Sequence, residues 1–404
     1  MNKILKISVL IIGLFILSII VMAIFRICPT KGPWPTPPWC VIQNVNSKFS
    51  YSEQSYLANT PSTNISIKND FVFGIGMMDL WGKLCTSPFT CDNPKEDVDT
   101  SFQRLKQLNT NLVMVTDFYQ IDRNKDFLEV NRGGARTISQ QDMKLLIDKA
   151  HENNMKFMLM TNLYEKEHSR EVLNNHDPEK QELNKLFDEW KIKILNQAKK
   201  GNYDYLVINP RDITFFFDKK EDNDYMNNKL VELIPEIRKV YSGKICLWGP
   251  SSWIEDFGDN YDCLIVDEDV KNIFRGISKL NNNIKLEDIT KKWNDYLDTI
   301  NYNPTTFVLI LMPSYKKSLD NGWIEPVGAK YGAEYVKDYK IQALVYEGFF
   351  EAVTNHPKIS GVISYGYWWN DNLYPNTLDI FRNDLSHSIR DKDAEAVFYK
   401  WANK

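Results

Sequence analysis

Carboxylates stand where apolar segments of the sequence end, and their placement suggests acid–base chemistry. Asp212 follows the apolar run in 203–210, and Asp267 and Asp269 end the run that starts at Cys263. Two carboxyl groups that flank a glycosidic bond can cleave it, one as a general acid and the other as a nucleophile or base. Asp212 with Asp267 or Asp269 is therefore a candidate catalytic pair.

Aromatic rings and amides follow the same kind of segment. Sugars bind such surfaces because their C–H faces stack on rings while their hydroxyl groups need polar partners. A single residue of this kind more often caps a helix or closes the core, but the whole set favours carbohydrate binding. The candidate substrate-binding residues are Asp117, Tyr119, Asn162, Asn209, Arg211, Trp248, Tyr315, Trp368 and Trp369.

Eight short apolar segments alternate with amphipathic stretches and would position these residues. Near-continuous apolar runs are typical of strands buried on both faces. Repeated strand–helix units predict the α/β class and a (β/α)8 TIM barrel, whose sites lie at the carboxyl ends of the strands. An open doubly wound sheet is the alternative, although no glycine-rich phosphate loop follows the first segment. The segments are 71–78, 111–118, 156–164, 203–210, 244–250, 263–269, 305–315 and 360–369.

Helices are expected between these strands. A shorter one should follow the fifth strand. The others are 139–154, 179–200, 226–241, 285–300, 333–355 and a last helix at 392–402.

The first residues predict a membrane anchor. Residues 7–25 are apolar and uncharged, long enough as a helix to cross a bilayer, and no small-residue cleavage site follows them. Lys3 and Lys6 precede them, which predicts a cytoplasmic N-terminus and an extracytoplasmic remainder. The expected parts are a transmembrane helix at 1–27, a Pro/Ser/Asn-rich extracytoplasmic linker at 28–66 and the barrel at 67–404.

The six cysteines fit an exported protein better than a cytosolic one. Cys85 and Cys91 share one loop and are the expected disulfide. Cys246 and Cys263 stand on successive predicted strands, where two buried thiols are as compatible with the sequence as a bridge. The pairing of these two and of Cys28 and Cys40 therefore stays open.

Composition and motifs argue against several other functions. The formal charge of -4 comes from interspersed signs, so a nucleic-acid partner is not expected. The five histidines lack metal-ligand spacing, and no Gly-x-Ser-x-Gly elbow occurs. We expect no cofactor and no metal, and as partners a carbohydrate or cell-surface glycan and the membrane.

Several segments resemble a known group of enzymes. "KLVELIPEIRKVYSGKICLWG" (229–249) resembles the helix-4 and strand-5 segment of clan A glycoside hydrolases of the endo-β-mannanase and β-galactanase kind. "LFDEWKIKILNQAKKGNYDYLVINPRD" (186–212) is similar to their helix 3 and strand 4, and "TTFVLILMPSY" (305–315) and "ISGVISYGYWWND" (359–371) to strands 7 and 8. The resemblance spans most of 71–404 and implies a glycoside hydrolase-like barrel.

The chain departs from this group where the group's chemistry resides. The families imply an acid/base glutamate ending strand 4 and a nucleophilic glutamate on strand 7, with carboxyl groups about 5 to 5.5 Å apart. The resemblance places Arg211 and Met312 at these positions. Arginine cannot transfer a proton at neutral pH and a thioether offers no carboxylate, so the resemblance implies that both catalytic glutamates are substituted.

Three functions therefore stay open. In the first, the barrel binds carbohydrate without the two-glutamate mechanism. Arg211 would then favour an anionic sugar. Alternatively it is an active glycosidase with relocated carboxylates, which requires the chain to bend after Pro210 so that Asp212 turns inward. The third function is a non-catalytic structural ectodomain whose aromatic residues only pack.

Overall fold

The computed structural model describes residues that all fall within the compact unit Ser62–Lys404. The expected anchor at 7–25 and the linker lie outside them. No helix in the described part of the chain is long and apolar enough to cross a membrane. The described residues are 67–77, 94–122, 129–131, 138, 140–165, 181–209, 220–249, 260–277, 284–300, 305–322, 336–367, 369 and 385–404.

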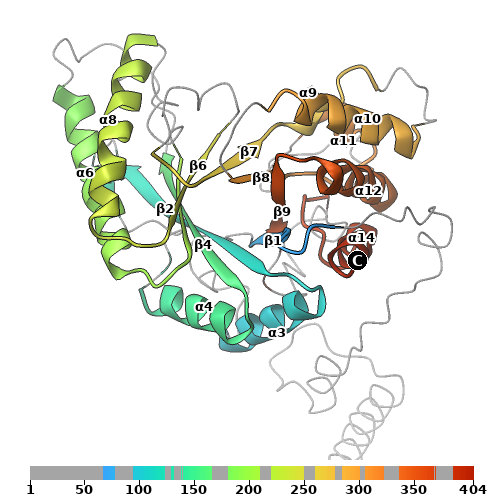
Figure 1. Cartoon of the computed structure of the whole chain (residues 1–404), viewed down its shortest axis with the longest axis horizontal. Helices are drawn as coiled ribbons and strands as arrows, with labels where there is room; N and C mark the ends of the chain where they lie inside the picture. The colour runs from blue at the N-terminus through green and yellow to red at the C-terminus, as the bar shows by residue number, and fades with distance from the viewer. Residues whose placement is uncertain are drawn as a thin grey trace, which may run out of the picture. The chain divides into compact units, whose positions relative to one another are not determined.

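Within these residues, eight parallel strands close into a barrel (Figure 1). Each strand pairs with the next, and β1 pairs with both β2 and β9, so the first strand joins the last. The predicted (β/α)8 barrel is confirmed, and the open sheet is wrong. The strands are β1 Val72–Met77, β2 Leu112–Asp122, β4 Lys156–Glu165, β5 Tyr205–Ile208, β6 Lys244–Trp248, β7 Cys263–Asp267, β8 Thr305–Ile310 and β9 Ile359–Tyr367.

The helices surround the strands on the outside of the barrel (Figure 1). The six helices predicted by range are all found, with bounds that differ from the expected ones by up to six residues. The expected short helix after the fifth strand lies outside the described residues. The helices are α3 Pro94–Gln107, α4 Gln140–Glu152, α6 Gln181–Lys200, α8 Lys220–Arg238, α9 Val270–Ile273, α10 Leu286–Leu297, α11 Ser318–Asn321, α12 Tyr339–Asn355 and α14 Asp393–Ala402.

Four described elements were not predicted, namely helix α3, strand β3 and the four-residue helices α9 and α11. Helix α3 buries Val98, Phe102 and Leu105, an i, i+4, i+7 spacing that could have revealed it. Strand β3 (Glu129–Asn131) pairs antiparallel with the far end of β2. Its three residues are too few to show a periodic pattern.

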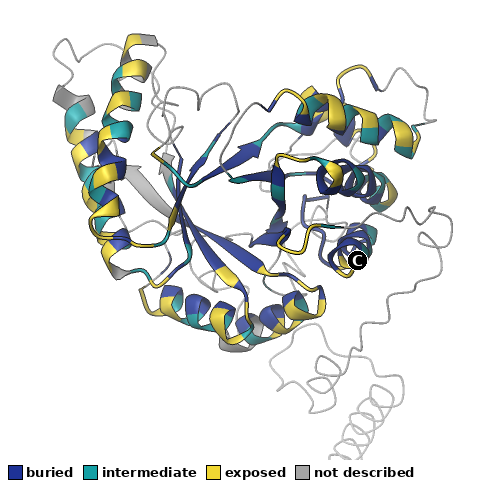
Figure 2. Ribbon diagram, viewed as in Figure 1, coloured by how far each residue is buried: buried dark blue, intermediate teal, exposed yellow. Residues whose placement is uncertain are grey.

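Both faces of the strands are buried (Figure 2). Alternate residues fill the lumen and the others meet the helices, where Trp190, Trp293 and Trp401 are the largest fully buried side chains. Full burial of one large apolar side chain contributes about 1.5 to 3 kcal/mol, so the two layers together dominate folding. The lumen is filled by Val72, Leu112, Met114, Met158, Met160, Tyr205, Val207, Cys246, Cys263, Ile265, Phe307, Leu309 and Ile363.

A buried ionic network joins α3, the end of β9 and α14. The Glu395 carboxylate accepts hydrogen bonds from Arg104 Nε at 2.9 Å, from Arg104 Nη2 at 2.6 Å and from the Tyr367 hydroxyl at 2.5 Å. Arg104 also pairs with the exposed Asp391. Burial opposes the charged form of Arg104, but Tyr367 and Glu395 outweigh it and raise the pKa of the guanidinium. Arg104 therefore stays charged and depends on Glu395.

We expect Glu395→Gln to lower the free energy of unfolding by about 3 to 5 kcal/mol, because it leaves the Arg104 cation buried without its main carboxylate. Urea denaturation at neutral pH measures the loss. Asp295→Asn is the matched control, since it breaks an exposed pair with Lys291 on α10 and should cost about 0.5 kcal/mol or less. Equal losses in the two variants would contradict the network's role.

His356 follows the end of α12 in a mostly buried position. Its imidazole is 10% exposed, with Nε2 3.5 Å from Asp298 Oδ1. Its Nδ1 has no hydrogen-bond partner among the described residues. Burial lowers the pKa of His356, and Asp298 opposes this only in part.

Stability should therefore fall as the pH drops through the histidine range. The unfolded chain takes up the His356 proton near pH 6.5, at about the ordinary pKa of histidine, whereas the folded chain takes it up only at lower pH. Acid thus favours the unfolded state. Urea midpoints between about pH 8 and pH 5 should show this decline, and His356→Gln should make it shallower. An unchanged pH dependence in the variant would refute the assignment.

Candidate functional site

Four polar residues face the lumen where strands β4 to β7 end, and we call them the polar rim. They are Asn162, Asn209, Trp248 and Asp267. Each stands two residues beyond a lumen-filling side chain, namely Met160, Val207, Cys246 and Ile265, and side chains two residues apart share a face. Asn209 is buried and the other three are half-buried. The rim lies at the end of the barrel where sites occur in this fold.

Trp248 links the rim to the apolar interior. Its ring packs against the lumen cluster, and its buried Nε1 has no hydrogen-bond partner within the described residues. The indole Nε1 atoms of Trp190, Trp293 and Trp401 also have no partner among the described residues, but these side chains are fully buried between the helices and the strands. Trp248 is thus the half-buried indole of the rim, with an apolar ring face and an N–H donor that has no partner in the described part of the chain.

The carboxylates 267 to 269 take different directions. Glu268 Oε1 accepts from Asp269 N at 3.1 Å and from Asn272 Nδ2 at 2.7 Å. Asp269 caps α9 by accepting from Lys271 N at 3.1 Å and pairs with the Lys271 ammonium at 3.1 Å. Asp267 is therefore the carboxylate of the three that faces the lumen. No group of histidine, cysteine and carboxylate side chains suited to a metal occurs in the described part of the chain.

Two predicted binding residues have packing roles in the structure. Asp117 faces away from the lumen, where its carboxylate accepts from Ile138 N at 3.1 Å and from Gln197 Nε2 of α6 at 2.6 Å. The Tyr315 hydroxyl is buried and donates to Gly322 O at 2.8 Å. Both side chains are thus engaged within the fold and are not part of the polar rim.

Trp369 lies on the side of α3. Its ring centroid is 6.5 Å from that of Phe102, and its carbonyl oxygen accepts a hydrogen bond from Ser101 Oγ. Ser101 also accepts from Arg390 Nη1 at 3.0 Å, and the Arg390 guanidinium lies 5.5 Å from the Tyr367 ring centroid. The loop after β9 is thus held at Trp369 by buried polar groups. The side chains of Tyr119, Arg211, Asp212, Trp368, Cys85 and Cys91 lie outside the described residues.

Tyr365 was not predicted as a site residue, but it lies against the lumen cluster. This half-buried side chain also stacks on the buried His387 ring, with centroids 5.9 Å apart and planes at 14°. A register shift between β1 and β9 and a positive φ of 98° at Gly366 interrupt the alternation there. Alternation along β9 predicts that Tyr365 faces the lumen. The same alternation would place Tyr367 there too, but the irregularity turns its side chain toward Glu395.

Met312, at the position that the resemblance aligns with the nucleophile, is fully buried. Its carbonyl oxygen accepts from Gln342 Nε2 of α12 at 2.7 Å. The neighbouring Leu311 is the residue of this segment that packs against the lumen cluster. No carboxylate is contributed to the rim by the described residues that end β8.

A disulfide joins Cys246 of β6 to Cys263 of β7. The two residues are register partners with Cα atoms 4.4 Å apart, and both are fully buried in the lumen. The bond resolves the alternative that the sequence left open. It links β6 and β7, the strands that end in Trp248 and Asp267. The bond therefore restrains the relative positions of these two rim residues.

The closed parallel barrel with a lumen-facing polar rim defines the (β/α)8 class, and solved structures share this fold. A GH113 β-1,4-mannanase is 18% identical with a TM-score of 0.57, over 83% of this chain and 99% of that chain. The GH113 β-mannanase AaManA from Alicyclobacillus acidocaldarius is 16% identical with a TM-score of 0.58, over 82% and 97% of the two chains. These neighbours confirm the resemblance to clan A barrels at the level of the fold. No protein-family profile and no curated protein sequence matches the chain.

Replacing Cys246 and Cys263 together with alanine should lower the free energy of unfolding by about 3 kcal/mol, the value for a cross-link that closes a loop of this length. Urea denaturation of the oxidised parent and of the variant measures it. Peptide mapping after alkylation without reductant provides the check. Unblocked thiols at both positions in the native protein would show that the bond does not form.

Proposed function

We propose that this chain is a membrane-anchored, extracytoplasmic barrel that binds carbohydrate in the cup at the carboxyl ends of its strands, without the two-glutamate mechanism. The observation that carries the proposal is the polar rim. Two amides, an indole and a carboxylate face the lumen at the ends of four neighbouring strands, next to an apolar core. Such a set offers hydrogen bonds to hydroxyl groups and an apolar face to a sugar ring.

The fold supports the location of the site. The similar solved structures are described as mannanases, one of them in complex with ManMIm. A shared barrel does not carry over a shared activity. The proposal therefore takes only the location of the site from the fold and takes the ligand class from the rim.

Two substitutions support the absence of the usual chemistry. Arg211 occupies the position of the acid in the resemblance, and Met312 that of the nucleophile. The burial of Met312 and the apolar Leu311 beside it leave no carboxylate from this segment in the described rim. Retaining hydrolysis by two facing carboxylates then lacks its nucleophile.

The lumen-facing Asp267 favours one alternative, an active glycosidase with relocated carboxylates. In this case Asp212 supplies the partner, while Asp269 is engaged as the cap of α9. A carboxylate pair at the rim would act as acid and as base or nucleophile. Turnover separates this alternative from binding alone.

Two features support the extracytoplasmic location. Residues 7–25 are apolar enough for an anchor. The Cys246–Cys263 disulfide is of a kind that persists in oxidising compartments and is rare in the cytosol of mesophiles.

The test assays the full chain in detergent against β-mannan, β-galactan, α-linked glycans and anionic glycans, recording binding and hydrolysis together. We expect saturable binding of at least one glycan without turnover, weakened about tenfold in Trp248→Ala because stacking and burial are lost. Tyr399→Ala, an exposed aromatic on α14, is the matched control and should bind like the parent.

Other outcomes would redirect the assignment. Hydrolysis that disappears in Asp267→Asn but survives in Asp295→Asn would establish relocated carboxylates. Absence of binding across the panel, in a chain whose folding is verified by its urea transition, would favour the structural ectodomain. Binding that Trp248→Ala leaves unchanged would move the site away from the polar rim.

A further inference from the structure

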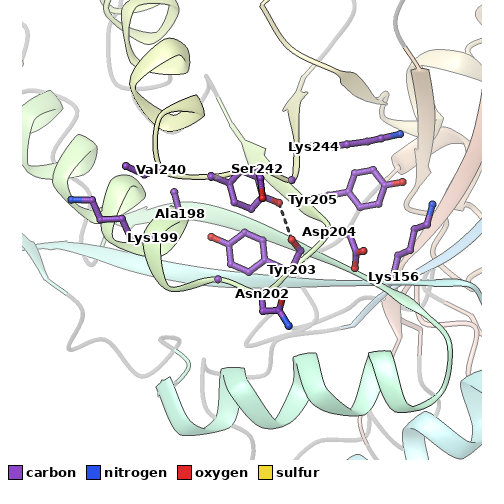
Figure 3. A pocket seen from close by; sticks show the side chains of 13 residues that line it. Lys156, Ala198, Lys199, Asn202, Tyr203, Asp204, Tyr205, Val240, Ser242 and Lys244 are labelled. Carbon is purple, nitrogen blue, oxygen red and sulfur yellow. Dashed lines mark hydrogen bonds between the residues drawn. The ribbon is translucent and has the colours of Figure 1, made fainter.

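A second concave site lies at the opposite end of the barrel from the polar rim. It is a pocket of about 370 Å³ at the start of β4, β5 and β6, beside the turns that leave α6 and α8 (Figure 3). Its volume lies within the range of about 300 to 1,000 Å³ that is usual for small-molecule sites. The buried Tyr205 ring separates it from the lumen, where that ring packs edge-on against Phe307 at 5.9 Å.

Three exposed lysines line this pocket, Lys156, Lys199 and Lys244. The ammonium groups of Lys156 and Lys244 each lie 5.8 Å from the centroid of the Tyr205 ring, so two cations from neighbouring sides converge on one aromatic floor. Figure 3 shows the two lysines beside Tyr205. None of the three forms an ion pair with any described residue.

Some lysines elsewhere in the described part of the chain have carboxylate partners. Lys144 pairs with Asp148, Lys191 pairs with Glu236 at 2.6 Å, and Lys291 pairs with Asp295 at 2.9 Å. These three ammonium groups have a carboxylate one turn or one helix away, whereas Lys156, Lys199 and Lys244 have no ion-pair partner among the described residues.

The carboxylate of the pocket is already engaged. Asp204 Oδ2 accepts from Phe157 N at 2.8 Å and from His151 Nε2 at 3.1 Å. These hydrogen bonds occupy its Oδ2 atom, and no ion pair joins Asp204 to a lysine of the pocket. The charge balance of the pocket is positive, and the exposed Asn202 and Ser242 add neutral polar groups at its mouth.

The walls of the pocket are preformed. A Cβ atom at Gly201 would collide with the Tyr203 ring, and one at Gly243 would collide with the Tyr241 ring. The Tyr241 hydroxyl donates to Tyr203 O at 3.1 Å and so joins the two turns. The backbone that frames the lysines is therefore held in place without a ligand, which lowers the entropic cost of binding.

We propose that this pocket binds a compact oxyanion, a phosphate or sulfate group, between Lys156 and Lys244 with Lys199 at the edge. Lysine ammonium groups bind phosphate as point charges that can approach a tetrahedral anion from several sides, whereas arginine binds carboxylate or phosphate through a planar fork. The described lining contains three lysines and no arginine. The ligand is either the free anion or a phosphate or sulfate ester on a larger molecule.

The experiment titrates the full chain with inorganic phosphate and with sulfate by isothermal calorimetry, with chloride adjusted to hold the ionic strength constant. We expect saturable binding at one site. Lys156→Gln with Lys244→Gln should weaken it about tenfold or more, since two charge-assisted contacts are lost. Lys144→Gln with Lys291→Gln removes the same charge from exposed helix positions and should change the affinity by less than about twofold.

A loss of equal size in both double variants would overturn the proposal, because it would show general attraction by net charge. Absence of saturable binding to either anion in the parent would overturn it too. The single variant Lys244→Gln gives a second measurement should the double variant unfold, and it should weaken binding by a smaller factor. Tighter binding of glycerol phosphate than of inorganic phosphate would identify an ester as the occupant, and the reverse would identify the free ion. Glycan binding at the polar rim should be the same in the lysine variants, so the two proposals fail separately.

Discussion

The closure of a parallel sheet on itself is the constraint on which the rest of this structure depends. Strand β1 completes the ring by pairing with β2 on one side and β9 on the other. Because each strand then has two neighbours, its side chains must fill either the lumen or the layer beneath the helices, and both layers are apolar. The buried network of Arg104, Glu395 and Tyr367 lies where α3, β9 and α14 meet, beside this closing seam.

The two ends of the same strands have different chemistry because the apolar lumen separates them. The carboxyl ends present the amides, the indole and the carboxylate of the polar rim, while the amino ends of β4 and β6 present Lys156 and Lys244. Between them the Cys246–Cys263 bond and the Tyr205 ring lie within the packed core. The two proposed sites therefore lie at opposite ends of the same strands, with the packed core between them.

The sequence by itself determined the class of fold and most element positions. Apolar runs of strand length, separated by amphipathic stretches, are local patterns. A strand buried on both faces is visible in the sequence as a nearly continuous apolar run. Strand β3 was not predicted because three residues are too few to show a periodic pattern. Helix α3 was not predicted either, although Val98, Phe102 and Leu105 have helical spacing. The residue types of the rim were also visible, since Asn162, Asn209, Trp248 and Asp267 all end apolar runs.

Only the tertiary structure decided which of the polar residues share the lumen. Asp117 and Asp267 look alike in sequence, yet one meets α6 and the other faces the cup, because strand parity is fixed by pairing around the ring. The irregularity near Gly366 sends Tyr367 to Glu395 and leaves Tyr365 at the lumen. The disulfide and the lysine pocket likewise follow from strand register, which brings residues from separate segments together. Sequence spacing specifies the elements, but only closure of the barrel specifies their neighbours.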